Sequence, residues 1–264
     1  MSLPPFDHSA EIKFTGPPNA SWSYGQKLDS TPGGQAWLEG EKQGWTVLDT
    51  KEQDPMKLYS LMISGIVPRP IAFVSTITET GEENLAPFSW FNMVTHNPPL
   101  VSFSCSNGPV RVKDTTNNVK NSKGGFTVNI ISEPFVENAN ATGVDAPTGF
   151  DEWSISGLTK EPSVSVKASR VKESAFSMEC ELFQAIDIIH PTTGKANNTL
   201  ILAYVKHIHV RNDVLNEKGL VELSKLKPVA RMGDITYATV GSAFRLPRLL
   251  WTEEESKINA ALKN

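Results

Sequence analysis

The chain has 264 residues, of which 39% are hydrophobic and 20% charged, a balance that excludes disorder over most of its length. Its 25 Lys and Arg residues against 29 Asp and Glu residues give a net charge of −4, so neither a nucleic-acid partner nor an acidic membrane surface is expected. Val, Ile and Thr together contribute 55 residues, and Gly and Pro, which favour turns, contribute another 36. This composition is typical of a β-rich fold.

Nothing in the sequence indicates a membrane or secretory protein. Pro, Lys or Asp interrupts every apolar run before it reaches the roughly 20 residues of a membrane helix. The first residues lack the positive and apolar segments of a secretory signal. The two cysteines, Cys105 and Cys180, lie in apolar strand-like runs and are predicted to be buried free thiols. We therefore expect a cytoplasmic protein with no membrane partner.

Residues 1–50 differ from the rest of the chain. They are rich in Pro and Gly, yet they carry four large aromatic residues: Trp22, Tyr24, Trp37 and Trp45. We predict an extended arm that packs on the main domain through these side chains, the alternative being a disordered tail. The main domain is expected over residues 51–250. A capping box at Thr252–Glu255 predicts a C-terminal helix in residues 251–264.

The middle of the chain reads as strands separated by short helices. Asp54 and Pro55 predict a helix start, and Gly65 its end. Further short helices are expected within residues 113–123 and 134–141. Strands are expected at residues 70–77, 84–92, 100–106, 126–131, 174–189 and 198–211. This order favours one antiparallel β-barrel with flanking helices, a mainly β fold.

Polar residues on two of these strands have more than one interpretation. Ser102, Ser104 and Ser106 share one face of a strand, and the alternation alone favours a solvent face over the wall of a polar pocket. His207 and His209 also share a face. A metal site would need His190 as a third ligand, so we favour a polar strand face and predict no metal.

The sequence lacks the usual catalytic motifs: G-x-G-x-x-G, the P-loop, H-E-x-x-H, G-x-S-x-G and C-x-x-C. The Lys113-Asp114-Thr115 triplet offers a cation, a hydroxyl and the start of a helix, which together suit a phosphate dianion. The triplet by itself is more typical of a solvated turn than of a phosphate site. Asp114 is expected to cap the helix, because a carboxylate would repel a phosphate.

Three segments, Arg69–Ser75, Asn84–Asn92 and Lys113–Thr115, together resemble the flavin reductase-like proteins with an FMN-binding split barrel. They match in order and spacing, and the resemblance extends over about residues 55 to 245. It implies a six-stranded antiparallel Greek-key split barrel that forms a homodimer and holds FMN at the subunit interface. Residues 150–153 resemble a mobile loop beside the flavin, the alternative being a surface turn that its aromatic residues anchor.

The resemblance also implies which residues contact the cofactor. Near the phosphate and ribityl chain it places Ser75, Thr76, Ser104, Lys113 and Thr115. Beside the isoalloxazine ring it places Asn84, Ala86, Pro87, Ser89, Trp90, Phe91 and Asn92. The serine face of residues 101–106 then becomes a pocket wall instead of a solvent face.

The function implied by the resemblance is that of an FMN-dependent oxidoreductase, which takes hydride from NAD(P)H and passes it to a small-molecule or flavin acceptor. Because the flavin ring itself does the redox chemistry, no catalytic residue is assigned. The alternative is a non-catalytic FMN-binding protein that stores flavin or senses redox state. A heme- or lipid-binding barrel is the least favoured interpretation.

Overall fold

The computed structural model describes residues 3–108, 111–121 and 123–263. The chain divides into two compact units, one formed by residues 1–59 with 241–264 and the other by residues 60–240.

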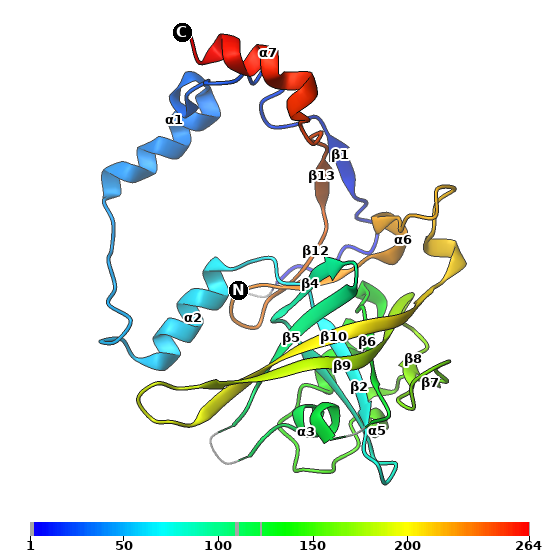
Figure 1. The fold of residues 1–264 in the computed structure, drawn as a ribbon. Helices are drawn as coiled ribbons and strands as arrows, with labels where there is room; N and C mark the ends of the chain where they lie inside the picture. Colours follow the sequence, from blue (N-terminus) through cyan, green and yellow to red (C-terminus); the bar gives the residue numbers. More distant parts are fainter. Residues whose placement is uncertain (1–2, 109–110, 122, 264) are drawn as a thin grey trace. The chain divides into compact units, whose positions relative to one another are not determined.

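The larger unit is built on a seven-stranded antiparallel sheet with the order β3-β2-β6-β9-β10-β5-β4 (Figure 1). Its strands are β2 (Ala72–Ile77), β3 (Glu83–Phe88), β4 (Phe91–His96), β5 (Pro99–Ser106), β6 (Phe126–Asn129), β9 (Phe176–Ile189) and β10 (Ala196–Val210). The two edge strands, β3 and β4, are consecutive in the chain and are separated only by Ser89 and Trp90. The chain therefore connects the two edges of the sheet directly.

The mainly β class is confirmed, with one more strand than the six expected. The difference arises in residues 84–92, which were predicted as one strand. Residues 84–88 pair with β2 at one end of the sheet. Phe91 and Asn92 belong to β4, which forms the opposite edge and pairs with β5. Because the two halves have different partners, the strand must break between them.

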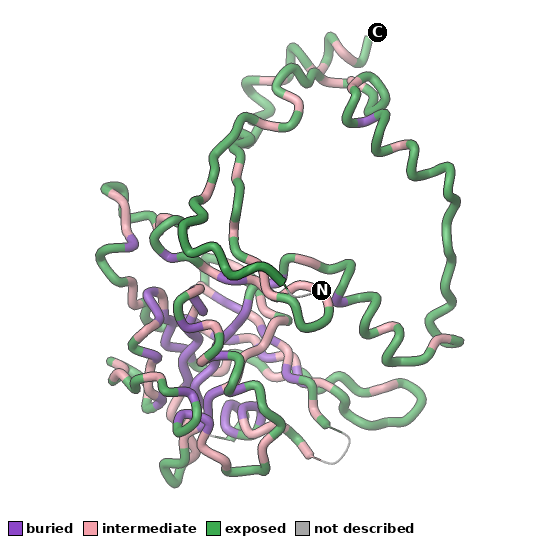
Figure 2. The backbone as a smooth tube through the Cα atoms, turned by 180° about the vertical axis from the view of Figure 1, so that it is seen from behind, coloured by how far each residue is buried: buried purple, intermediate pink, exposed green. Residues whose placement is uncertain are grey.

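Much of the sheet is buried, as the purple segments of Figure 2 show, whereas β4 and the second half of β9 are largely exposed. Side chains of one face form a cluster with Val74, Phe103 and Phe126. Phe73 belongs to a second cluster with Leu85. Neighbouring residues thus enter different cores, which explains why residues 71–74 are continuously apolar.

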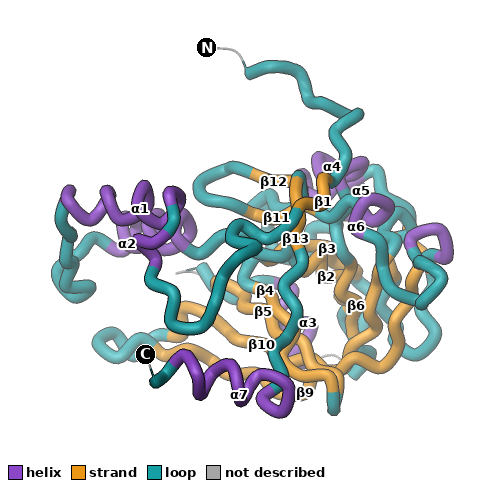
Figure 3. The backbone as a smooth tube through the Cα atoms, turned by 90° about the horizontal axis from the view of Figure 1, so that it is seen from above, coloured by secondary structure: helices purple, strands orange, loops and turns teal. Residues whose placement is uncertain are grey.

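Further helices and short strands complete the larger unit. The helices are α2 (Pro55–Gly65), α3 (Asp114–Asn121), α4 (Val136–Ala141), α5 (Trp153–Ser156) and α6 (Leu223–Leu226), with 3-10 turns η3 (Glu133–Phe135) and η4 (Asn212–Val214). The short strands are β7 (Lys160–Glu161), β8 (Arg170–Val171), β11 (Val229–Arg231) and β12 (Tyr237–Thr239). Helix α2 is divided between the two units at residues 59 and 60. Helices α4, α5 and α6 lie beside the strands of the sheet (Figure 3). Asp54 caps α2 as predicted, since its Oδ1 accepts from the amides of Met56 and Lys57 at 3.0 Å each.

Two residues fix the chain where it leaves α2 and α3. The Arg69 guanidinium donates to the carbonyls of Ile63 and Ile66 at 2.5 and 2.9 Å and thereby satisfies the end of α2. After α3 the chain turns at Gly125 with a φ of +70°, where a Cβ would lie 2.9 Å from the Cys180 carbonyl oxygen. Glycine is required there both for its conformation and for the space.

The smaller unit holds two paired strands, β1 (Lys13–Thr15) and β13 (Ser242–Phe244), which run parallel. Its helical segments are η1 (Leu28–Ser30), α1 (Pro32–Leu38), η2 (Glu39–Gln43) and α7 (Trp251–Ala261). Among its described residues only Gly34 is buried. Trp37 and Trp45 are 77% and 86% exposed, so the unit itself does not cover them. Packing of the arm on the main domain stays a prediction.

The C-terminal helix lies within the expected residues 251–264, but the capping box predicted at Thr252–Glu255 is wrong. Leu250 is the N-cap residue of α7, and no side chain accepts a hydrogen bond from the first turn. Thr252 lies inside that turn, so its hydroxyl is not in the position from which an N-cap side chain reaches the free amides.

Candidate functional site

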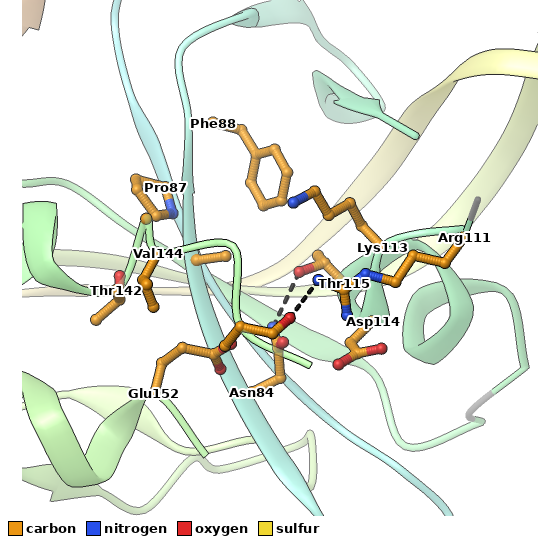
Figure 4. A pocket seen from close by; sticks show the side chains of 13 residues that line it. Asn84, Pro87, Phe88, Arg111, Lys113, Asp114, Thr115, Thr142, Val144 and Glu152 are labelled. Atoms are coloured by element: carbon orange, nitrogen blue, oxygen red, sulfur yellow. Dashed lines mark hydrogen bonds between the residues drawn. The ribbon is translucent and has the colours of Figure 1, made fainter. Parts of the chain in front are cut away.

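A hollow in the larger unit lies between β3, the start of α3 and the loop that precedes α5 (Figure 4). It encloses about 490 Å³ of atom-free space, part of which is open to solvent. Its walls are formed by Asn84, Ala86, Pro87, Phe88, Arg111, Lys113, Asp114, Thr115, Thr142, Gly143, Val144, Ala146 and Glu152. Residues from three distant parts of the sequence thus meet at one place.

Two side-chain hydrogen bonds attach α3 to the strands behind the hollow. Asn84 donates through Nδ2 to Thr115 Oγ1 at 2.9 Å, and Asn118 donates through Nδ2 to Thr76 Oγ1 at 2.9 Å. Thr76 and Asn84 are directly paired across β2 and β3, and all four side chains are buried. Buried amide and hydroxyl groups need such partners, so these bonds fix the start of the helix against the sheet.

The positive charge at the hollow comes from Arg111 and Lys113. Both contact Oδ1 of Asp145, Arg111 through NH2 at 3.0 Å and Lys113 through Nζ at 2.8 Å. These two cations lower the pKa of Asp145 by hydrogen bonding and by charge. Arg111 was missed in the sequence analysis. Its signal was its spacing from Lys113, because residues two apart in an extended segment project to the same side.

Asp114 does not have the predicted role of helix cap. It is the first residue of α3, and its Oδ2 accepts from the amide of Gly149 at 2.9 Å. This bond attaches the loop after Thr142 to the start of the helix. A guanidinium, an ammonium and the free amides of a helix start form a donor set that suits a phosphate. The site residues therefore fit the phosphate end of FMN.

Glu152 is a second carboxyl group that the sequence analysis did not select. It lines the hollow, is buried, and accepts from the Leu85 amide at 3.2 Å through Oε2. Burial raises its pKa, and the charges of Asp114 and Asp151 act in the same direction, while backbone hydrogen bonds oppose them. Its neighbour Trp153 is buried in the second core cluster. The buried Trp153 agrees with the alternative interpretation of residues 150–153, a turn that its aromatic residues anchor.

The structure brings five of the predicted site residues together in the hollow: Asn84, Ala86, Pro87, Lys113 and Thr115. Thr76 lies directly behind them through its bond to Asn118. Ser75 is next to Thr76 in an extended strand, so its side chain projects from the opposite face. It is completely buried there, and its hydroxyl has no hydrogen-bond partner among the residues that the structure describes.

The other predicted residues lie outside the hollow. Ser89 accepts from Arg69 Nε at 3.4 Å, and the Trp90 carbonyl accepts from the Ser104 amide at 2.9 Å. Phe91 packs against the first core cluster, and Asn92 is exposed. Ser104 is half-buried, and its hydroxyl lies 3.5 Å from Asn198 Nδ2.

The predicted polar strand face at His207 and His209 is present. His209 Nε2 lies 2.6 Å from Glu179 Oε1, and His207 Nδ1 lies 3.0 Å from Ser165 Oγ. His190 instead accepts from the amides of Thr192 and Thr193 through Nδ1 in its own turn. Within the described residues no group of three His, Cys, Asp or Glu side chains is placed to hold a metal ion.

Comparison with known proteins shows the family. Residues 64–229 match the flavin reductase like domain. The chain is also 39% identical over 190 residues to an uncharacterized protein of Aquifex aeolicus, covering 71% of this chain and 92% of that protein. The chain belongs to the flavin reductase-like family.

Two solved structures show how this flavin reductase-like chain compares in three dimensions. Nitrilotriacetate monooxygenase component B from Bacillus cereus is 34% identical, with a TM-score of 0.73 and coverage of 77% of this chain and 99% of that one. A split barrel protein from Shewanella frigidimarina is 20% identical, with a TM-score of 0.66 and coverage of 78% and 100%. The fold is thus a split barrel. Among the described residues, no helix has the length and apolar character needed to cross a membrane.

Proposed function

We propose that this protein is a cytoplasmic homodimer that binds FMN and transfers hydride from NAD(P)H to the flavin. The observation that carries the proposal is the pair of cations, Arg111 and Lys113, at the hollow beside β3 in a flavin reductase-like split barrel. A phosphate needs cations and amide donors, and both are present at the start of α3.

The chain's own residues bind the FMN and orient it. Arg111, Lys113 and the amides at the start of α3 hold the phosphate, and Thr115 keeps that helix in place through Asn84. Ala86 and Pro87 supply the β3 wall that runs on from the phosphate end. When bound, the isoalloxazine ring of FMN supplies the hydride chemistry. We therefore assign positioning roles to these residues and no catalytic residue.

A homodimer accounts for features that one chain leaves incomplete. Trp90, Phe91 and Asn92 lie outside the hollow of a single chain, so a second chain would be needed to include them in an interfacial flavin site. The β9–β10 hairpin, yellow in Figure 1, exposes several large apolar side chains. They are Phe183, Ile186, Ile188 and Ile189. Exposed apolar patches of this kind mark association surfaces, and homodimers are the commonest solution.

The solved neighbour named as a monooxygenase component suggests where the electrons go. That protein is component B of nitrilotriacetate monooxygenase. We propose by analogy that the flavin reduced by this protein serves a separate oxidising partner or a small acceptor, and that the flavin exchanges.

Anaerobic mixing with each nicotinamide tests the proposal. The FMN-loaded protein should lose its oxidised flavin absorbance within seconds on addition of NADH or NADPH, and air should restore it. A flavin that stays oxidised with both nicotinamides, yet is reduced by dithionite, would instead indicate a storage or sensing protein.

A further inference from the structure

Asp145 places one carboxylate oxygen between the two cations of the proposed phosphate site. Its Oδ1 lies 2.8 Å from Lys113 Nζ and 3.0 Å from Arg111 NH2. The Asp145 side chain is 80% exposed, whereas those of Arg111 and Lys113 are 30% and 38% exposed. The carboxylate therefore covers the cations from the solvent side, in the position that an incoming anion would take.

Further hydrogen bonds attach the loop that carries Asp145 to residues 111–114. Arg111 donates to the Ala146 carbonyl and, at 3.3 Å, to the Thr148 hydroxyl. Asp114 accepts from the Gly149 amide at 2.9 Å. Ala146 is itself part of the wall of the hollow. The contacts of Asp145 are thus part of a set of hydrogen bonds that hold this loop against residues 111–114.

We propose that Asp145 is an internal competitor for the phosphate of FMN and determines how strongly this site distinguishes FMN from riboflavin. This inference rests on the proposed function. Two anions cannot share the same donors of Arg111 and Lys113 without repulsion, so Asp145 leaves both cations when a phosphate binds. Part of the phosphate's binding free energy then offsets the two broken ion pairs. Riboflavin has no phosphate and leaves those pairs intact.

The consequence is a flavin that exchanges. Asp145 weakens FMN binding, and in the complex it is the group that reoccupies the cations as the phosphate departs. Both effects favour release of FMN, which suits a protein that hands reduced flavin to an acceptor. The two ion pairs are solvent-exposed, so each one contributes only modestly.

Flavin titration of Asp145→Asn tests this inference. We expect FMN to bind about threefold to tenfold tighter than in the unmodified protein at low salt, and to dissociate more slowly by a similar factor. Riboflavin affinity should not change. Asp213→Asn is the matched control, since it removes an exposed aspartate paired with Arg211 at 2.6 Å and leaves the hollow intact. The control should bind both flavins normally.

Several outcomes would overturn the inference. Unchanged or weaker FMN binding in Asp145→Asn would mean that the carboxylate positions the cations or has no part in binding. An equal change for FMN and riboflavin, reproduced in Asp145→Ala, would mean that it acts through the loop and not through the phosphate. If the unmodified protein binds neither flavin, the proposed function itself fails, which this experiment distinguishes.

Discussion

The imidazole of His209 and the carboxylate of Glu179 join two neighbouring strands, with Nε2 and Oε1 2.6 Å apart. Glu179 is completely buried. Its carboxylate also accepts from the amides of Val164 and Ser165 at 2.7 Å each, and from the Ser165 hydroxyl at 2.7 Å. One carboxylate therefore fixes the chain around residue 165 to the face of the sheet.

Glu179→Gln should make the protein less stable in a pH-dependent way. Burial alone would raise the pKa of Glu179, but the hydrogen bonds from Val164, Ser165 and His209 outweigh it and lower the pKa to about 2. Because the folded pKa lies below the unfolded value, the stabilisation is complete above about pH 4.5 and disappears as the pH falls toward 2.

We expect the variant to lose about 2–3 kcal/mol of unfolding free energy at pH 7, and to approach the unmodified protein as the pH falls below 4.5. Urea denaturation across this range measures the difference. Glu181→Gln is the control, because Glu181 is exposed and its pair with Lys206 spans 3.4 Å. A loss that does not depend on pH would contradict the assigned role.

Arg69→Met should destabilise the larger unit. The buried guanidinium donates to the carbonyls of Ile63, Ile66 and Met232, and the substitution leaves these acceptors without it. We expect a loss of about 2–4 kcal/mol. Arg69→Lys should not restore stability, since an ammonium cannot reproduce the spread of the guanidinium donors. Full stability of the lysine variant in chemical denaturation would contradict this.

Removing both cations, in Arg111→Ala with Lys113→Ala, should weaken FMN far more than riboflavin. Hydrogen bonds to a charged phosphate contribute about 1.5–3 kcal/mol, so FMN affinity should fall at least tenfold. Fluorescence titration of both flavins measures the contrast. Lys160→Ala, which removes a cation on β7, is the control. Equal losses for the two flavins would show that the cations do not contact phosphate.

Neither thiol should react with a disulfide reagent in the folded protein. Both cysteines are buried, and burial raises the pKa of Cys105 to about 12 and also raises that of Cys180. The reactive thiolate is therefore scarce as well as inaccessible. Absorbance assay at pH 8 should detect no thiol before unfolding and two thiols per chain in guanidinium. Rapid reaction of the native protein would show that a strand opens.

A charge on the exposed hairpin should disrupt the proposed homodimer. Phe183→Asp places a carboxylate in the apolar surface of β9, where association would have to bury it. Sedimentation should change from a dimer to a monomer that retains its fold. Val164→Asp, also at an exposed apolar residue but outside the hairpin, should leave the dimer intact. A monomeric unmodified protein would contradict the dimer directly.

Local sequence patterns determined much of the architecture. The Asp54 cap, the apolar run of residues 71–74 and the alternation of Val101, Phe103 and Cys105 each depend on residues a few positions apart. Helix capping and strand alternation act over that range, so the sequence is sufficient for them. The cation at Lys113 could also be predicted from the sequence, because the Lys113-Asp114-Thr115 motif spans only three residues.

Tertiary structure decided which side chains meet. Adjacent residues of a strand must face opposite ways, but only the sheet shows that Thr76, not Ser75, lies behind the hollow. Strand pairing at opposite edges decides the break at Ser89 and Trp90. Asp145 reaches Lys113 across 32 positions, and Glu179 reaches His209 across 30. Such contacts depend on strand register and loop closure, for which short-range periodicity carries no information.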